Sequence, residues 1–498
     1  MSAFNLRVPG WDGTPLAVDV QLPDPSLWPV PAVVTRTPYG RSHHLAEGRG
    51  WTRRGFAYVV QDVRGRHDSD GVWECYRNER GDGAALADWA LSREWSDGRL
   101  IGYGGSYSGF TAWALAAERP DSVPVVVSMG PSMALHRTKF EDGVLRLAEH
   151  AAWWLDRADS RTGRDGLASL LLGADPGVLS HLPVTGLPER LGVRLPGWAG
   201  VVRRGPDHRP EEEITESELA GLPVSGMHIG GWYDLLVDET LLHWRTVGTG
   251  RAPRPPQWLV VGPWGHDLAF TGRTRYGDRE HGPVSSLDLG ALQVEWIRAC
   301  LDGTARAGEL VLPVGADTWR PWPRAEGETV LHAHPAGTLR DTPPDGPAGS
   351  FRHDPDDPCP SLAPGTDRRG LDARADVLRF TATPLTTGTT LTGAHVDLEV
   401  GASAGDADWI VRLVERTATG QVFELARGRA AGSGRCVLSP FAAVPASGSR
   451  LRLEIGGGDF PRLARSLGTG ADRYTTTATA PVRQTVHAAR LSLRHACP

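Results

Sequence analysis

The pattern of apolar positions divides the chain into three parts, of which the first combines strands and helices. Short apolar runs such as "VPAVVTRTPYG" and "GFAYVVQDVRG" end in glycine turns, and they alternate with stretches of helical period such as "GDGAALADWALSREW". Continuous apolar runs of this length are typical of strands buried on both faces of a parallel sheet. Strands and helices in alternation predict an α/β domain.

A helical section interrupts this pattern between about residues 131 and 223. Two stretches there, "GVLRLAEHAAWWLDRADS" and "DGLASLLLGADPGVLSHLP", have helical period and are joined by loops rich in proline and glycine. Strand signals return with "VSGMHIGGWYD" and "PPQWLVVGPWGHD". We therefore predict that residues 1–130 and 224–307 form one α/β domain with a helical insertion. Residues 131–223 form a helical cap, because loops at the carboxyl ends of strands accept insertions.

The third part, residues 308–498, changes to period two. Stretches such as "DWIVRLVERTATGQVFELARG" and "SRLRLEIGGG" alternate apolar and polar residues between turns rich in glycine and proline. This spacing predicts an all-β sandwich or jelly roll. A proline-rich stretch at residues 332–370 is expected to be a long connection on the surface of that domain.

Composition and charge exclude several classes of function. The chain has 498 residues and a net charge of −6 without a basic stripe, which argues against a nucleic-acid partner. No stretch reaches the roughly 18 apolar residues of a membrane span, and no secretory signal opens the chain, so we expect a cytoplasmic protein without a membrane partner. The five cysteines are scattered without a CxxC pair, and HExxH is absent, so we expect no disulfide framework, metal or cofactor. Lys139 is the only lysine, which we attribute to the composition of the genome.

The stretch "IGYGGSYSGF" offers Ser106 as a nucleophile, because a strand precedes it and a helix follows it. An α/β-hydrolase places its nucleophilic serine on such a turn and flanks it with glycines. The last glycine, Gly109, comes one residue later than in G-x-S-x-G. From this stretch alone a structural turn is an equal alternative. Ser108 is the local competitor, but it falls inside the first helical turn.

Asp234 and His266, much later in the chain, complete the order Ser, Asp, His that is typical of α/β-hydrolases. Asp234 follows the strand in "HIGGWYDLLVDE" and His266 follows the strand in "WLVVGPWGHDL". An aspartate after a strand is more often a helix cap, and Asp238 and Asp267 are nearby rivals. Three candidates in this order, each at the edge where such a sheet gathers its active site, favour a serine hydrolase. His266 would take the proton of Ser106, and Asp234 would orient the imidazole.

Five motifs together resemble the cocaine esterase and Xaa-Pro dipeptidyl-peptidase family of serine hydrolases, which also includes α-amino-acid ester hydrolases. The motifs are "RTPYGR", "VVQDVRGRHDSDGVW", "GYGGSYSGF", "GGWYD" and "VVGPWGHD". The resemblance spans almost the whole chain and is weakest in the helical insertion. It implies an α/β-hydrolase domain, a helical cap and a C-terminal jelly roll. The late glycine at Gly109 is the form of the turn that this family has.

The resemblance also implies further site residues. The oxyanion hole would consist of the main-chain N–H of Tyr107 and the hydroxyl of Tyr39 in the "PYG" turn. Gln61 matches a position that lines the acyl pocket of the family, although it could equally be a structural hydrogen-bonding residue. We expect Asp62 and Arg64 of "DVRG" to pair beside the site.

The acyl pocket would include residues of the cap. Trp153, Trp154 and His150 are expected near it, although most of the 18 tryptophans of the chain will belong to hydrophobic cores. Related α-amino-acid ester hydrolases have carboxylates two and three residues after the catalytic aspartate. This chain has Leu236 and Val237 there, so we predict a neutral acyl group, aromatic or polyketide-like.

These observations lead to one main hypothesis about function, a serine hydrolase that cleaves a small-molecule ester or amide through an acyl-enzyme. An acyltransferase with an alcohol or amine acceptor would use the same chemistry. An Xaa-Pro dipeptidyl aminopeptidase is less favoured, because peptidases of the family have a large additional N-terminal domain. A non-catalytic ligand-binding protein is the alternative from another class. The β domain could roof the active site or form the interface of a homodimer.

Overall fold

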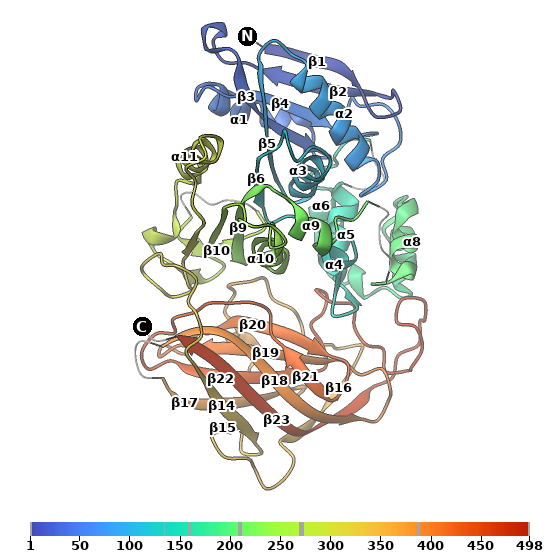
Figure 1. The fold of residues 1–498 in the computed structure, drawn as a ribbon. Coiled ribbons are helices and arrows are strands. Elements are labelled where there is room, and N and C mark those ends of the chain that lie inside the picture. The colour runs from blue at the N-terminus through green and yellow to red at the C-terminus, as the bar shows by residue number, and fades with distance from the viewer. Residues whose placement is uncertain are drawn as a thin grey trace.

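The structure is a computed structural model that describes residues 2–133, 135–157, 161–207, 212–267, 273–385 and 389–496. It confirms the predicted fold class, an α/β-hydrolase domain with a helical cap and a C-terminal jelly-roll domain. The hydrolase domain and the β domain lie one above the other in Figure 1, with the cap helices to one side between them. None of the described helices is long and apolar enough to cross a bilayer.

The hydrolase domain is built on a nine-stranded sheet with the order β1-β2-β4-β3-β5-β6-β9-β10-β13. The strands from β3 onward pair in parallel, whereas β2 is antiparallel to both of its neighbours. Their bounds are Ser2–Pro9 (β1), Pro15–Gln21 (β2), Val30–Thr37 (β3), Ala57–Asp62 (β4), Ser96–Gly105 (β5), Val125–Met129 (β6), Ser225–Tyr233 (β9), Gln257–Gly265 (β10) and Gly308–Val311 (β13).

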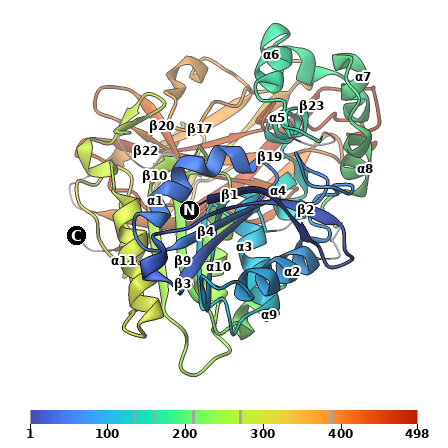
Figure 2. The same cartoon turned by 90° about the horizontal axis from the view of Figure 1, so that it is seen from above.

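Helices cover both faces of this sheet, which explains the continuous apolar runs of its strands. Successive residues of a strand point to opposite faces. Val33 accordingly packs in the core beneath α1 and α11, while Val34 packs beneath α2 and α3. Figure 2 shows α1 and α11 on one side of the sheet and α2 and α3 on the other. The helix bounds are Leu45–Thr52 (α1), Glu79–Leu91 (α2), Tyr107–Glu118 (α3), Val237–Thr246 (α10) and Leu289–Leu301 (α11).

The cap is the segment between β6 and β9, and it has a hydrophobic core of its own. Trp154, Leu155 and Trp198 are buried there, together with Ile410 and Leu463 of the β domain. The cap therefore packs on the β domain as well as on the catalytic sheet. Its elements are α4 (Leu135–Lys139), β7 (Phe140–Glu141), β8 (Val144–Leu145), α5 (Leu147–Asp156), α6 (Leu167–Ala174), α7 (Leu187–Leu191), α8 (Pro196–Arg204) and α9 (Glu216–Gly221).

The β domain forms one sheet with the order β20-β19-β22-β17-β15-β14-β23-β18-β21, and β16 also pairs with β23. The proline-rich stretch is more ordered than expected from the sequence, because it contains the short strands β15 and β16. The bounds are Gly327–His334 (β14), Thr338–Arg340 (β15), Gly349–His353 (β16), Val377–Pro384 (β17), Thr390–Ala402 (β18), Trp409–Arg416 (β19), Val422–Ala430 (β20), Gly434–Val437 (β21), Arg450–Gly456 (β22) and Val482–Ala496 (β23).

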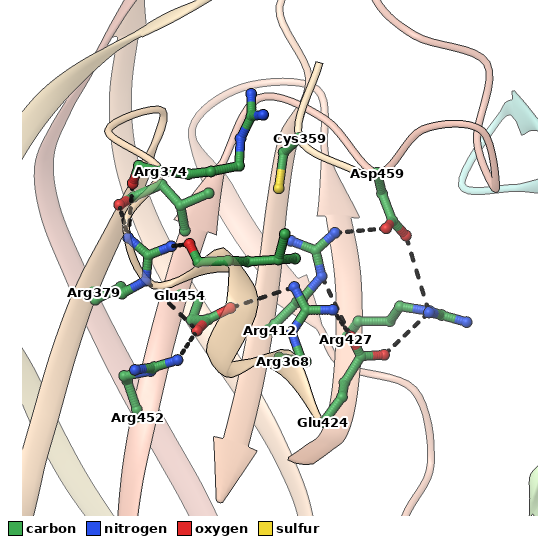
Figure 3. A network of polar contacts seen from close by, with 12 residues as sticks. Cys359, Arg368, Arg374, Arg379, Arg412, Glu424, Arg427, Arg452, Glu454 and Asp459 are labelled. Atoms are coloured by element: carbon green, nitrogen blue, oxygen red, sulfur yellow. Dashed lines mark hydrogen bonds and ion pairs between the residues drawn. The ribbon is translucent and has the colours of Figure 1, made fainter. Parts of the chain in front are cut away.

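A network of buried ion pairs crosses the interior of the β domain (Figure 3). Arg412 is fully buried and pairs with Asp459 at 2.7 Å and with Glu424 at 3.3 Å. Charges removed from water are tolerated only when partners compensate for the lost hydration. The network continues into the cap through Arg462, whose guanidinium lies 2.5 Å from both Asp459 and Glu141. Ionic contacts thus reinforce the apolar junction between the cap and the β domain.

Candidate active site

The turn after β5 holds Ser106 in a backbone conformation that is unfavourable for a residue with a side chain. Its φ is 55° and its ψ is −124°, in a region that mainly glycine occupies. A Cβ at Gly104 would stand 2.5 Å from the Ser108 main-chain oxygen, and one at Gly109 would stand 3.0 Å from Pro131. Both glycines therefore let the chain pack closely around the turn, and Ser106 lines a cavity above the sheet.

Asp234 and His266 lie at the ends of β9 and β10 and form a hydrogen-bonded chain with Ser106. The Ser106 Oγ lies 3.0 Å from His266 Nε2, and His266 Nδ1 lies 2.9 Å from Asp234 Oδ1. The Leu236 main-chain N–H also donates to Asp234 Oδ1 at 2.8 Å. Gly130 has a φ of +46°, and a Cβ there would stand 2.5 Å from Asp234 Oδ2. Glycine at this position leaves the space that the carboxylate needs.

The surroundings of His266 favour its protonated form. Burial by itself would lower the pKa of the imidazole, but the charge of Asp234 and its hydrogen bond outweigh burial, so the pKa lies above its usual value. The side chain is still 32% exposed, so water reaches it. The imidazole can thus hold a proton taken from Ser106 and exchange it with a leaving group or with solvent.

Two groups beside Ser106 can donate hydrogen bonds, the Tyr39 hydroxyl and the Tyr107 main-chain N–H. The Tyr39 hydroxyl lies 3.3 Å from Ser106 Oγ. Tyr39 is held in the turn after β3 by Gly40, whose φ is 101° and whose added Cβ would stand 2.9 Å from the His67 ring. Tyr107 is the first residue of α3, so its N–H has no acceptor within the helix. Its side chain points into the core instead, where its hydroxyl donates to Glu79 Oε1 at 3.0 Å.

A cavity of about 290 Å³ opens in front of Ser106. Trp153 and Leu236 line it, as expected from the sequence, and so does His150. Trp154 does not line it, because this side chain faces the core of the cap. Lys139, Thr138 and Glu149 also lie in the wall, and sequence reasoning missed all three. The sequence held one sign for Lys139, because it is the only lysine of the chain and falls in the cap segment.

Gln61 lies away from this cavity. Its side chain is 1% exposed within β4, and its Oε1 accepts a hydrogen bond from Arg36 Nε at 2.8 Å. The structure therefore supports the structural alternative for Gln61, because this side chain is buried and hydrogen-bonded to Arg36. Ser108 is likewise buried, inside α3.

The expected pair between Asp62 and Arg64 is wrong. Asp62 forms an ion pair with Arg41, whereas Arg64 pairs with Asp82 at 2.7 Å and with Asp12 at 2.8 Å. The strand ends at Asp62, so Arg64 already belongs to the next turn and faces the beginning of α2. Both arginines fix loops that surround the site without reaching the cavity.

A second, larger cavity of about 820 Å³ adjoins the first one. The two share His266, Leu235 and Glu149 in their walls. Asp238, a rival candidate in the sequence, lines the larger cavity and makes no hydrogen bond to His266 among the described residues. Residues of the β domain, among them Ser361 and Arg427, also line the larger cavity.

Comparisons with known proteins agree with this arrangement. Residues 12–267 match the family model of the X-Pro dipeptidyl-peptidase (S15 family), and residues 315–492 match that of the X-Pro dipeptidyl-peptidase C-terminal non-catalytic domain. The cocaine esterase of Rhodococcus sp. (strain MB1 Bresler) is 29% identical over 483 residues, which cover 86% of this chain and 82% of that protein.

Solved structures show the same fold at lower identity. An α-amino acid ester hydrolase superposes with a TM-score of 0.82 at 21% identity and covers 99% of this chain and 96% of its own. An aminopeptidase from a marine sediment archaeon, Thaumarchaeota archaeon, has the same TM-score and the same coverage at 18% identity. At these identities the likeness concerns the fold.

Proposed function

The chain belongs to the X-Pro dipeptidyl-peptidase (S15) family and is a serine hydrolase, and from this premise we propose that it cleaves a small-molecule ester through an acyl-enzyme. The observation that carries the proposal is the hydrogen-bonded chain from Asp234 through His266 to Ser106 at a strained turn. Strain of this kind persists where the surrounding structure enforces it, and such positions cluster at active sites.

The geometry assigns a role to each residue. Ser106 attacks the ester carbonyl while His266 Nε2 accepts its proton, and Asp234 stabilises the imidazolium. The Tyr39 hydroxyl and the Tyr107 N–H donate to the oxyanion of the tetrahedral intermediate. His266 then gives the proton to the departing alcohol, and afterwards it activates the water that hydrolyses the acyl-enzyme. No step requires a cofactor.

The walls of the small cavity support an acyl group without a positive charge. Trp153 and Leu236 present apolar surface there, and Val237, at a position where related α-amino-acid ester hydrolases have a carboxylate, lines the adjoining larger cavity. Glu149 is the observation that favours a second candidate, an aminopeptidase of the Xaa-Pro dipeptidyl type. Its Oε2 is buried at the cavity wall without a hydrogen-bond partner among the described residues. A substrate ammonium group would supply donors to that oxygen.

Access of water supports hydrolysis over acyl transfer. Acyl transfer requires that water be kept from the acyl-enzyme, whereas the His266 side chain is 32% exposed and borders the 820 Å³ cavity. Mass analysis of the products with and without alcohol and amine acceptors tests this point. Transfer products in excess of the free acid would replace the hydrolase by an acyltransferase.

The proposal is tested by labelling and by a matched pair of substrates. A fluorophosphonate probe should label the native enzyme at Ser106 and fail to label Ser106→Ala, and a folded native protein that never labels would overturn the proposal. Methyl phenylacetate should be cleaved faster than methyl phenylglycinate, which differs by the α-amino group. The reverse order, together with cleavage of Xaa-Pro anilides, would establish the aminopeptidase instead.

Location and assembly remain predictions. The cytoplasmic location is supported by the four described cysteines, which are free thiols: Cys75, Cys300, Cys359 and Cys436. Cell fractionation with an activity assay would test it. A homodimer built through the β domain would be detected by light scattering of the purified chain.

A further inference from the structure

The composition of the genome can explain why the chain has one lysine, but it does not explain why this lysine, Lys139, lies in the wall of the cavity. It is the only lysine among 53 lysine and arginine residues, and it lies in the wall of the cavity that contains Ser106. The other 52 of these residues are arginines. An ammonium group differs from a guanidinium in being a compact charge that loses its proton more readily when buried.

Within the described part of the chain, the amine of Lys139 has no counter-ion. The residue is 5% exposed, and Nζ lies 4.0 Å from the ring centre of Trp153 and 5.8 Å from that of Trp154. No carboxylate of the described residues forms an ion pair with it. The aromatic faces attract the charge but cannot accept the three N–H donors as an oxygen would. Burial lowers the pKa of Lys139 to about 7, an effect opposed by Cys75 and reinforced by Arg146.

Further polar groups around this cavity also have no partner within the described part of the chain. Both ring nitrogens of His150 are buried without a hydrogen bond, and so is Glu149 Oε2. Burial and the nearby Lys139 hold the pKa of His150 well below its usual value, so the ring is neutral. Buried polar groups are nearly always hydrogen-bonded in native proteins. Several exceptions in the wall of one cavity indicate a polar ligand, in addition to the apolar contacts of Trp153.

We propose that Lys139 binds an oxygen acceptor at the far end of the acyl group, so that the preferred substrates carry a carbonyl or carboxylate oxygen beyond the reacting ester. The inference rests on the proposed function, because it takes Ser106 as the residue that receives the acyl group. The ammonium donates to the distal oxygen while the reacting carbonyl lies at Tyr39 and the Tyr107 N–H. The same cation repels an α-ammonium group, in agreement with the apolar wall at Leu236.

Three ethyl esters of similar shape test the proposal: ethyl pentanoate, ethyl 4-oxopentanoate and ethyl hydrogen succinate. A charge-assisted hydrogen bond in a buried site raises kcat/KM about tenfold or more for an ester that can accept it. We expect such an advantage over pentanoate for the oxo ester, for the hemisuccinate or for both, and the better of these two identifies the acceptor as ketone or carboxylate. In Lys139→Met the advantage should fall to less than about threefold.

A second cation of the cavity provides the control. Arg157 lies 5.6 Å from the Tyr39 ring and has a carboxylate partner in Asp165. Arg157→Met should therefore leave the ratio between the esters unchanged, even if all rates shift together. The proposal is overturned if pentanoate is cleaved as well as the other two esters, or if their advantage survives in Lys139→Met.

Labelling keeps this test separate from the test of the proposed function. If fluorophosphonate labels Ser106 and ethyl pentanoate is cleaved but the esters do not differ, only the role of Lys139 fails. If Ser106 is never labelled, the proposed function fails as well. Lys139→Met should melt no lower than the native protein, because an ammonium without a counter-ion is costly to bury.

A chemical probe gives a measurement on the native chain. Reductive methylation with formaldehyde can modify only one lysine side chain, which mass spectrometry identifies in the peptide that contains Lys139. Succinate or levulinate should protect this peptide, and pentanol of similar length should not. Equal modification in all cases would contradict the proposed contact.

Discussion

The strain at Ser106 predicts that two variants lacking the nucleophile differ in stability. Ser106→Ala and Ser106→Gly both remove Oγ, so both should be inactive. Alanine keeps a Cβ at a φ of 55° and a ψ of −124°, whereas glycine adopts that conformation without steric conflict. Ser106→Gly should therefore be the more stable of the two.

The expected difference follows from two opposing contributions. A residue with a side chain in such a sparsely populated region costs about 1–3 kcal/mol. Glycine loses more backbone entropy on folding, which costs about 0.5–1 kcal/mol relative to alanine. The net advantage of Ser106→Gly is about 1 kcal/mol, which corresponds to roughly 2 °C in Tm for a domain of this size.

Differential scanning calorimetry of both variants measures this difference. Ser108 offers a matched control two residues later, because it lies in the first turn of α3 with ordinary helical geometry. There the order should be reversed, with Ser108→Gly melting below Ser108→Ala. If Ser106→Gly melts at or below Ser106→Ala while the control pair shows its expected order, the argument from strain is refuted.

Four further predictions concern the chemistry of the site. Tyr39→Phe should lower kcat by about 10²–10³ with little change in KM, as measured by steady-state kinetics, because one oxyanion donor is lost. Asp234→Asn should lower kcat by about 10⁴, since the tautomer of His266 is no longer fixed. The kcat/KM profile should fall as the pH drops through the pKa of His266, which is raised above about 6.5. An acid limb that lies lower would contradict that shift. Gly130→Ala should reduce both kcat and labelling by fluorophosphonate, because its Cβ displaces Asp234; unchanged kinetics would show that the carboxylate has room to move.

The fold could be predicted from the sequence because its signals are local. The continuous apolar runs of β3 and β4 and the helical period of α2 and α3 are patterns within about ten residues. The site candidates Ser106, Asp234 and His266 stood out because each follows an apolar strand, and neighbouring parallel strands end at one edge. The structure joins these three side chains in one chain of hydrogen bonds, with His266 in the middle.

Other features could not be predicted, because they depend on partners that are distant in the chain. The short strand β16 pairs with β23, more than a hundred residues later. Arg64 finds its carboxylates in the first loop and in α2, so the spacing of "DVRG" carries no information about pairing. Gln61 and Trp154 each had two possible environments, and the orientation of the strand or helix decided which one they occupy. Lys139 was visible as an isolated residue type, but only the cavity gives it a chemical context.

The contribution of the β domain to the 820 Å³ cavity bears on how such enzymes diversify. Ser361, Leu362 and Phe441 lie in loops of the β domain and line this cavity together with His266, whereas Ser106, Asp234 and His266 all belong to the hydrolase domain. Loops of that domain can accumulate substitutions without disturbing the turn at Ser106 or the strands beneath it. Selectivity for the leaving alcohol can therefore drift between lineages while the catalytic chemistry stays constant. A directed-evolution library aimed at new alcohols would do well to begin in these loops.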